Sequence, residues 1–220
     1  MASEHMVSSM ERQACRLCGT ALLSLSLILA GCGVGDDPTP QDTAPEVFNV
    51  TFKTSSGPFE VEFVREWSPA AVDRVWTLVR EGYWVGSRIY RVNDQYAQFG
   101  YSGQPYLDAE WVQKGIADEP VRSSNVRGSV AFARSGVMSR SSILFVNRSD
   151  NSYLDQLSWL GVTGFPPVGR VISGMETVDG LYAAYGDDPM QWEDSIAAAG
   201  NPFLERKFPR LDSIMSVEMR

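Results

Sequence analysis

The sequence has few of the side chains on which many active sites depend. Its 220 residues contain one histidine, His5, and three cysteines, Cys15, Cys18 and Cys32, all of them near the amino terminus. Histidine-dependent catalytic triads and most zinc sites are therefore excluded from the rest of the chain. The Cys15-x-x-Cys18 spacing is that of a redox or metal pair, but no second ligand pair accompanies it. Since no disulfide can form beyond Cys32, a fold built there must rest on packing alone.

Basic residues are also in deficit. The chain has 19 Lys and Arg against 27 Asp and Glu, which gives a formal net charge of -8 at pH 7. A nucleic-acid-binding protein needs a basic patch or stripe to neutralise phosphates, so this balance argues against nucleic acid as a partner. An acidic surface mainly favours solubility.

A long apolar run is missing as well. The most apolar stretch, residues 21–29, follows Arg12 and Arg16 and is shorter than the about 20 residues of a membrane span, which is typical of an export signal. Residues 29–32, Leu-Ala-Gly-Cys, resemble the bacterial lipobox, in which the cysteine is lipidated and becomes the first residue after cleavage. The alternative is an ordinary signal peptide with an incidental cysteine.

The lipobox resemblance implies a lipoprotein signal peptide over residues 1–31 and a lipid attached to Cys32. Because glycine follows this cysteine rather than the aspartate of an inner-membrane retention signal, we expect an extracytoplasmic protein on the periplasmic face of the outer membrane. Residues 32–45 carry three prolines and few apolar side chains, which predicts a flexible spacer. Residues 46–220 are enough for one folded domain.

Local patterns in this domain predict a hairpin followed by a helix. Apolar residues alternate over 47–54 and 58–64 on either side of a Ser-Ser-Gly turn, which predicts two antiparallel strands. Ser68 and Pro69 are typical of a helix start, apolar residues then recur at helical spacing, and Gly82 ends the pattern. A second apolar stripe between Gly174 and Gly186 predicts a second helix.

The rest of the domain consists mainly of short apolar runs. They cover residues 88–92, 96–99, 129–133, 143–147, 168–172 and 213–219. Many short strands with two helices predict a mostly β fold, a closed antiparallel barrel that leaves no exposed sheet edge. Residues 187–209 are expected to form a long loop with some helix packed on the barrel.

Four segments of this domain stand out together. They are Gly-Tyr-Trp-Val-Gly-Ser-Arg-Ile-Tyr-Arg-Val at 82–92, Arg-Gly-Ser-Val-Ala-Phe-Ala-Arg at 127–134, Ser-Ile-Leu-Phe-Val-Asn at 142–147 followed by Tyr-Leu-Asp at 153–155, and Val-Gly-Arg-Val-Ile-Ser-Gly-Met at 168–175. In this order they resemble the cyclophilin family of peptidyl-prolyl cis-trans isomerases. The resemblance extends over residues 47–219 and implies an eight-stranded antiparallel barrel capped by two α-helices.

The resemblance also implies a site. Arg91 matches the family's catalytic arginine, which acts beside an apolar proline pocket with no metal or cofactor. The positions implied for substrate binding are Tyr96, Ala97, Phe99, Ala133, Arg134, Ile143, Phe145, Tyr153, Leu154 and Phe165.

Five of these positions depart from the family pattern, and two of them are Tyr153 in place of a frequent tryptophan and Phe165 in place of a frequent histidine. Phe99 stands where the family has a glutamine, and Gln98, one residue earlier, is expected to face the opposite side of its strand. Ile143 replaces a second pocket glutamine, and Arg134 replaces an asparagine. Arg134 either takes over contacts to the substrate backbone or pairs with an acidic residue on the surface.

Two functions are compatible with these features. The first is a monomeric prolyl isomerase that acts on proline-containing segments of exported proteins and is held at a membrane by its lipid. The second is a catalytically weak or inactive module of the same fold that binds proline-containing segments or a partner protein.

Overall fold

The computed structural model describes residues 43–220. The predicted signal peptide, Cys32 and most of the predicted spacer lie outside the described residues. Ala44, expected from the sequence to belong to the spacer, is only 4% exposed, and its N–H donates to Asp73 Oδ1 at 2.9 Å. The packed domain therefore includes Ala44.

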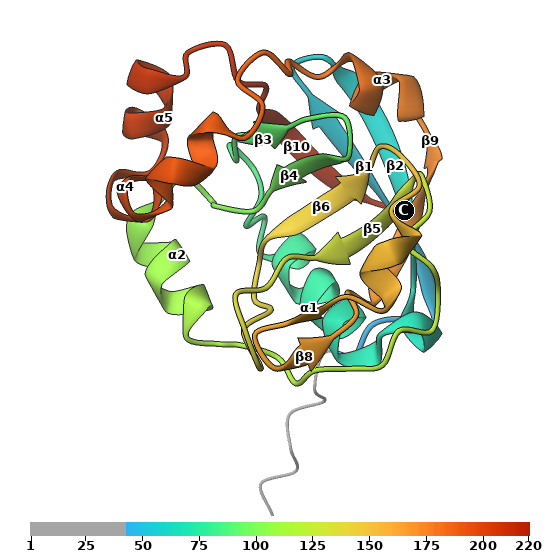
Figure 1. The fold of residues 1–220 in the computed structure, drawn as a ribbon. Helices are drawn as coiled ribbons and strands as arrows, with labels where there is room; N and C mark the ends of the chain where they lie inside the picture. Colours follow the sequence, from blue (N-terminus) through green and yellow to red (C-terminus); the bar gives the residue numbers. More distant parts are fainter. Residues whose placement is uncertain (1–42) are drawn as a thin grey trace, which may run out of the picture. The chain divides into compact units, whose positions relative to one another are not determined.

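Eight strands form one antiparallel sheet, seen in Figure 1 as a curled barrel wall. They are β1 (Val47–Thr54), β2 (Gly57–Val64), β3 (Arg91–Val92), β4 (Tyr96–Phe99), β5 (Ser129–Phe132), β6 (Leu144–Asn147), β9 (Pro167–Ser173) and β10 (Ile214–Met219). The strand order is β10-β1-β2-β9-β5-β6-β4-β3. The predicted hairpin is confirmed, since β1 and β2 pair from Val47 and Val64 to Thr54 and Gly57.

Backbone contacts join the two edges of this sheet. Arg88, just before β3, and Ser213, just before β10, form an antiparallel bridge. The N–H of Ile89 donates to the carbonyl of Asp212 at 2.9 Å. The expected mostly β fold, an eight-stranded antiparallel barrel, is confirmed, and closure satisfies backbone groups that would otherwise lie at open edges.

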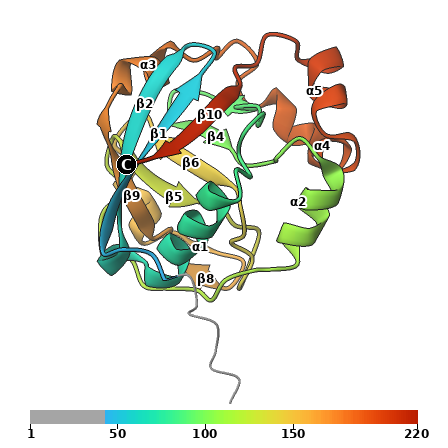
Figure 2. The same cartoon turned by 180° about the vertical axis from the view of Figure 1, so that it is seen from behind.

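The barrel is filled with aromatic side chains and closed by α1 (Pro69–Arg80), the helix predicted after Ser68. Phe52 and Phe59 stack inside it with ring centroids 5.1 Å apart. The helix buries one face, formed by Ala71, Val72, Val75, Leu78 and Val79. Figure 2 shows α1 against the barrel from behind.

The helices other than α1 differ from the prediction, since the described part of the chain has five α-helices rather than two. They are α1, α2 (Pro105–Val112), α3 (Met175–Gly180), α4 (Glu193–Ala199) and α5 (Asn201–Lys207). The helix expected between Gly174 and Gly186 is α3 alone, because Leu181 turns to φ -59° and ψ 144° and ends it. Sequence patterns did not predict α2, because its apolar residues form no regular stripe.

The additional helices are concentrated at one side of the barrel. In both views α2, α4 and α5 lie together, away from α3 (Figures 1 and 2). Three short 3-10 helices, η1 (Arg65–Trp67), η2 (Ser152–Asp155) and η3 (Asp188–Trp192), and a small hairpin of β7 (Ser158–Trp159) and β8 (Val162–Thr163) complete the elements. Over residues 43–220 no helix is both long and apolar enough to cross a bilayer.

Candidate active site

A short turn between β3 and β4 fixes the position of Arg91. The two strands pair in antiparallel register with Arg91 opposite Gln98. Asn93 shapes the turn, because its Oδ1 accepts hydrogen bonds from the N–H groups of Gln95 at 2.9 Å and Tyr96 at 2.8 Å. Arg91, Tyr96 and Gln98 therefore lie on one face of the β3–β4 pair.

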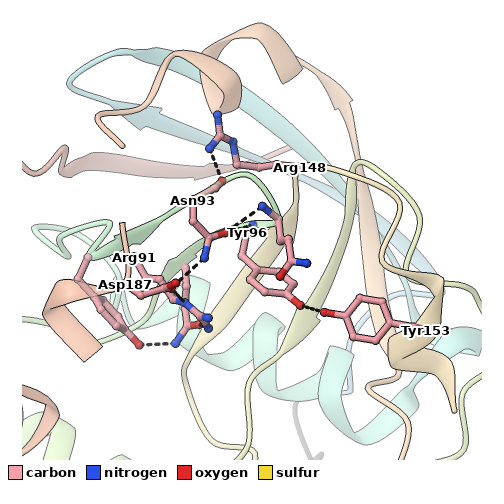
Figure 3. Close-up of polar contacts among 9 residues, drawn as sticks. Arg91, Asn93, Tyr96, Arg148, Tyr153 and Asp187 are labelled. Carbon is pink, nitrogen blue, oxygen red and sulfur yellow. Dashed lines mark hydrogen bonds and ion pairs between the residues drawn. The ribbon is translucent and has the colours of Figure 1, made fainter. Parts of the chain in front are cut away.

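The guanidinium of Arg91 is held from two directions, as Figure 3 shows for its contact with Asp187. Arg91 Nε donates to Asp187 Oδ1 at 2.6 Å, and Nη1 donates to Gln98 Oε1 at 3.2 Å. Its carbon Cζ lies 5.0 Å from the ring centroid of Tyr96. No hydrogen bond among residues 43–220 uses Nη2, which leaves donors of Arg91 for a ligand.

Asp187 comes from the segment just before η3, far from Arg91 in sequence. Its Oδ1 also accepts a hydrogen bond from Asn93 Nδ2 at 2.8 Å, so one carboxylate oxygen joins the arginine to the turn (Figure 3). Partial burial alone would raise the pKa of Asp187, but the hydrogen bond and charge of Arg91 outweigh it and lower the pKa below its ordinary value. Asp187 therefore remains a carboxylate at neutral pH.

The structure corrects the expected orientation of Gln98. Its side chain faces the groove, bonded to Arg91 and donating from Nε2 to the hydroxyl of Tyr90 at 2.7 Å. Phe99 and Ala97 face the barrel interior instead and do not line the groove, and each is only 2% exposed. The reason is the two-residue alternation of β4, which places Gln98 on the same face as Tyr96.

An apolar cluster forms the floor of the groove beside Arg91. Phe145 on β6 and Leu154 on η2 are each 5% exposed, and Tyr96, Ala133 and Phe165 pack against them. Phe145 meets Tyr96 edge to face with ring centroids 5.4 Å apart, and it meets Phe165 in the same way at 6.2 Å. Such edge-to-face contacts hold aromatic rings in fixed orientations.

Tyr96 and Tyr153 close one side of the groove through a hydrogen bond between their hydroxyls (Figure 3). Burial, together with this hydrogen bond, raises the pKa of Tyr96 well above its ordinary value. Tyr96 is therefore a neutral phenol at physiological pH. Tyr153 is 51% exposed and lies at the rim.

Arg134 lies over the face of Phe165, with its carbon Cζ 4.3 Å from the ring centroid. Its Nη2 donates to the carbonyl of Val162 at 3.0 Å, while its buried Nε has no hydrogen-bond partner among the described residues. Arg134 forms no ion pair within residues 43–220, contrary to the alternative of a surface pair. Burial lowers the pKa of its guanidinium, which nevertheless stays charged.

Ile143 lines the groove, and the chain passes very close to its backbone at Gly100. This glycine follows β4 with φ +139°, and a Cβ at that place would lie 2.4 Å from the Cα of Ile143. Only glycine permits both the angle and the approach. An apolar side chain thus occupies the place expected to hold a pocket glutamine.

These residues line one cavity of about 800 Å³. All the predicted site residues contribute to its wall except Ala97 and Phe99. A further set of lining residues was not predicted from the sequence: Gln98, Tyr101, Asp108, Val112, Ser135, Ser139, Ser141, Ser142, Leu157, Trp159, Leu160, Met190, Glu193, Asp194 and Ala197. Alternation from Tyr96 would have found Gln98, whereas most of the others lie on α2, on the β7–β8 hairpin or on η3 and α4, whose places in space no local pattern predicts.

The barrel and its arginine-lined apolar groove agree with the resemblance stated from the sequence. The family model described as cyclophilin type peptidyl-prolyl cis-trans isomerase/CLD matches residues 49–201. The chain therefore belongs to the cyclophilin-type peptidyl-prolyl cis-trans isomerases.

Solved structures agree with this fold at low sequence identity. A cyclophilin-type isomerase of Cryptosporidium parvum is 17% identical with a TM-score of 0.56, and the match covers 79% of this chain and 98% of that one. A structure of a Cryptosporidium parvum cyclophilin-type isomerase in the presence of the dipeptide Ala-Pro is 16% identical with a TM-score of 0.56. This match covers 78% of this chain and 98% of that one. A cyclophilin from Hirschia baltica is 15% identical with a TM-score of 0.55, and the match covers 80% of this chain and 75% of that one.

Proposed function

We propose that this cyclophilin-type isomerase acts on X-Pro bonds of exported proteins, with Arg91 as its catalytic residue. The observation that carries the proposal is the placement of the Arg91 guanidinium, fixed by Asp187 and Gln98 at the edge of a cavity whose floor is formed by Phe145 and Leu154. A proline ring fits an apolar floor of this kind, and the amide to be twisted then lies beside the arginine.

The chemistry requires no covalent step. Rotation about an amide bond costs about 18–20 kcal/mol because the twisted amide loses its resonance. As resonance is lost, the proline nitrogen becomes pyramidal and its lone pair can accept a hydrogen bond. Arg91 is a permanently charged donor, so it interacts more strongly with the twisted state than with the planar amide and lowers the barrier.

The walls of the groove assist by excluding water. Phe145, Leu154 and Phe165 offer apolar surface to the proline ring, and in the drier cavity the charge of Arg91 acts with less screening. Gln98 and Asp187 act through Arg91 as positioning residues, since each accepts a hydrogen bond from its guanidinium. Arg134, whose Nη1 forms no hydrogen bond among the described residues, supplies a donor for a carbonyl of the substrate backbone.

The location of the protein forms part of the proposal. The Leu-Ala-Gly-Cys sequence at 29–32 supports lipid attachment at Cys32, on the periplasmic face of an outer membrane. At that place the proline-containing segments within reach of a monomer belong to exported proteins. Attachment of more than one acyl chain is needed for stable anchoring.

A second function is a binding module with little turnover. The observation in its favour is the apolar side chain of Ile143, which replaces a polar group in the groove. Exchange NMR on a short Ala-Pro peptide, with titration calorimetry on the same peptide, separates the two. We expect catalysed exchange between cis and trans forms. Binding without catalysed exchange would favour the binding module. Absence of both binding and catalysed exchange would contradict both functions.

A further inference from the structure

We propose that Asp108, Glu193 and Asp194, which line the groove cavity from α2 and α4, bind the cationic side chain of a lysine or arginine near the substrate proline. This inference rests on the proposed function and names a substrate class for it. The three carboxylates belong to the same cavity as Arg91, and α2 and α4 are neighbours.

Asp108 is the buried member of this acidic subsite and is only 7% exposed. Its Oδ1 accepts hydrogen bonds from the hydroxyl of Tyr83 at 2.6 Å and from the N–H of Ser102 at 2.7 Å. Its Oδ2 is buried and has no hydrogen-bond partner within the described part of the chain. An unsatisfied buried carboxylate oxygen is costly, and a donor brought by a ligand would relieve that cost.

Glu193 and Asp194 stand in the first turn of α4, and neither forms an ion pair among residues 43–220. The helix dipole accounts for acidic residues at that position, but it does not account for Asp108 on another helix. Burial raises the pKa of Glu193, the charge of Arg91 opposes this effect, and the charge of Asp194 adds to it. The pKa of Tyr101, in the same wall, is raised by burial and then by the charges of Glu193, Asp108 and Asp194.

Neither arginine of the cavity forms an ion pair with these carboxylates among residues 43–220. Arg91 is bonded to Asp187 and Gln98, and Arg134 lies over Phe165. The subsite wall also has apolar members, Met190, Ala197 and Val112. A lysine or arginine suits this combination because it places an aliphatic stem along apolar surface and a cation at its end.

The test uses proline peptides that carry lysine, norleucine or glutamate at one position, scanned from three residues before the proline to three after it. Isomerisation is measured by exchange NMR and affinity by calorimetry. At one position we expect the lysine peptide to bind and isomerise about fivefold better than the norleucine peptide, as for a partly exposed ion pair. The glutamate peptide should bind and isomerise less well than the norleucine peptide. The preference for lysine should decline at ~0.5 M salt.

Variants assign the preference to the carboxylates. In the double variant Glu193→Gln/Asp194→Asn, the affinity and rate for the lysine peptide should approach those for the norleucine peptide, so that their ratio approaches one. Asp194→Asn alone should lower this ratio in part. Glu66→Gln is the matched control, because Glu66 is an exposed acid that does not line the cavity, and it should keep the wild-type ratio. The salt dependence of the wild type serves as readout if the double variant does not fold.

The outcomes separate this inference from the proposed function. Catalysed exchange with equal rates for lysine and norleucine peptides at every position would overturn the acidic subsite and leave the isomerase intact. A lysine preference unchanged in the double variant would also overturn it. If no proline peptide is bound or turned over, the proposed function fails first, and the subsite fails with it.

Discussion

Arg91 on β3 and Asp187, which precedes η3, form an ion pair with 2.6 Å between Nε and Oδ1 although 96 positions separate them. The same carboxylate oxygen accepts a hydrogen bond from Asn93 in the turn after β3. The segment leading into the additional helices of this chain is thus bonded to the residue proposed to carry catalysis. Removal of either partner should affect turnover, but in different ways.

Replacement of Arg91 by alanine should nearly abolish isomerisation. Loss of one preorganised donor costs about 10²–10³-fold in rate, or roughly 3–4 kcal/mol. Thermal stability should change little, because the side chain is partly solvated and leaves no large cavity. Exchange NMR and thermal unfolding measure the two effects. Arg170→Ala removes an exposed arginine on β9 outside the groove as a control, and full activity in Arg91→Ala would refute the assigned mechanism.

Replacement of Asp187 by asparagine should lower kcat several-fold and leave KM nearly unchanged, since Asp187 acts by positioning Arg91. The lowered pKa also gives a pH dependence. The carboxylate bond to Arg91 is complete above the unfolded pKa of about 3.9 and is lost as pH falls through the lower folded pKa. Wild-type kcat should therefore fall below about pH 4 by a step that Asp187→Asn lacks.

Asp179 provides the control for this pH dependence. Its pKa is also lowered, by a hydrogen bond from Arg127, but it does not line the groove. Asp179→Asn should change acid stability without removing the step in kcat. Identical pH profiles for the wild type and Asp187→Asn would contradict the positioning role.

Replacement of Phe145 by alanine should weaken both peptide binding and folding. Phe145 is buried in the groove floor, so its truncation leaves a cavity and costs roughly 3–5 kcal/mol of stability. Phe99→Ala is the matched control, because Phe99 is also buried but faces the core. It should lose similar stability while the folded fraction keeps its affinity. Calorimetry measures the peptide affinity and urea denaturation measures the stability of each variant. Equal loss of affinity in both variants would contradict the assignment of Phe145 to the proline-binding floor of the groove.

Replacement of Glu119 by alanine should destabilise the fold without changing the groove. Glu119 accepts hydrogen bonds from the N–H groups of Ala70 at 2.8 Å and Ala71 at 3.3 Å, at the start of α1, and pairs with Arg140 at 3.0 Å. Arg140 is only 1% exposed, so the variant leaves a buried charge unpaired, at a cost of about 3–5 kcal/mol. Urea denaturation measures the loss, and Glu119→Ala/Arg140→Met should recover part of it. No recovery would show that capping of α1 dominates.

Replacement of Cys32 by serine should release the protein from membranes, because lipid attachment needs the thiol. Fractionation of the native host, with mass determination of the product, measures the change. Cys18→Ser is the control, since Cys18 lies within the predicted signal peptide and should not alter anchoring. A processed Cys32→Ser protein that stays in the membrane fraction would rule out anchoring at this residue.

The sequence by itself determined the features that depend on neighbouring residues. Alternation predicted the β1–β2 hairpin, and the Ser68-Pro69 start with its apolar stripe predicted α1. The family segments led to the barrel and to Arg91, Phe145 and Leu154, which the structure brings together in one groove. These patterns are readable because backbone geometry fixes the facing of side chains within one element.

Only the tertiary structure decided what depends on distant segments. The orientation of Gln98 was predicted wrongly because the count began at Arg91 and crossed a turn, where the alternation of a strand is interrupted. The bond of Arg91 to Asp187 and the grouping of Asp108 with Glu193 arise from packing of α2, η3 and α4 on the barrel. Contacts between such distant residues are set by how whole elements bury their apolar surfaces together, which no local spacing records.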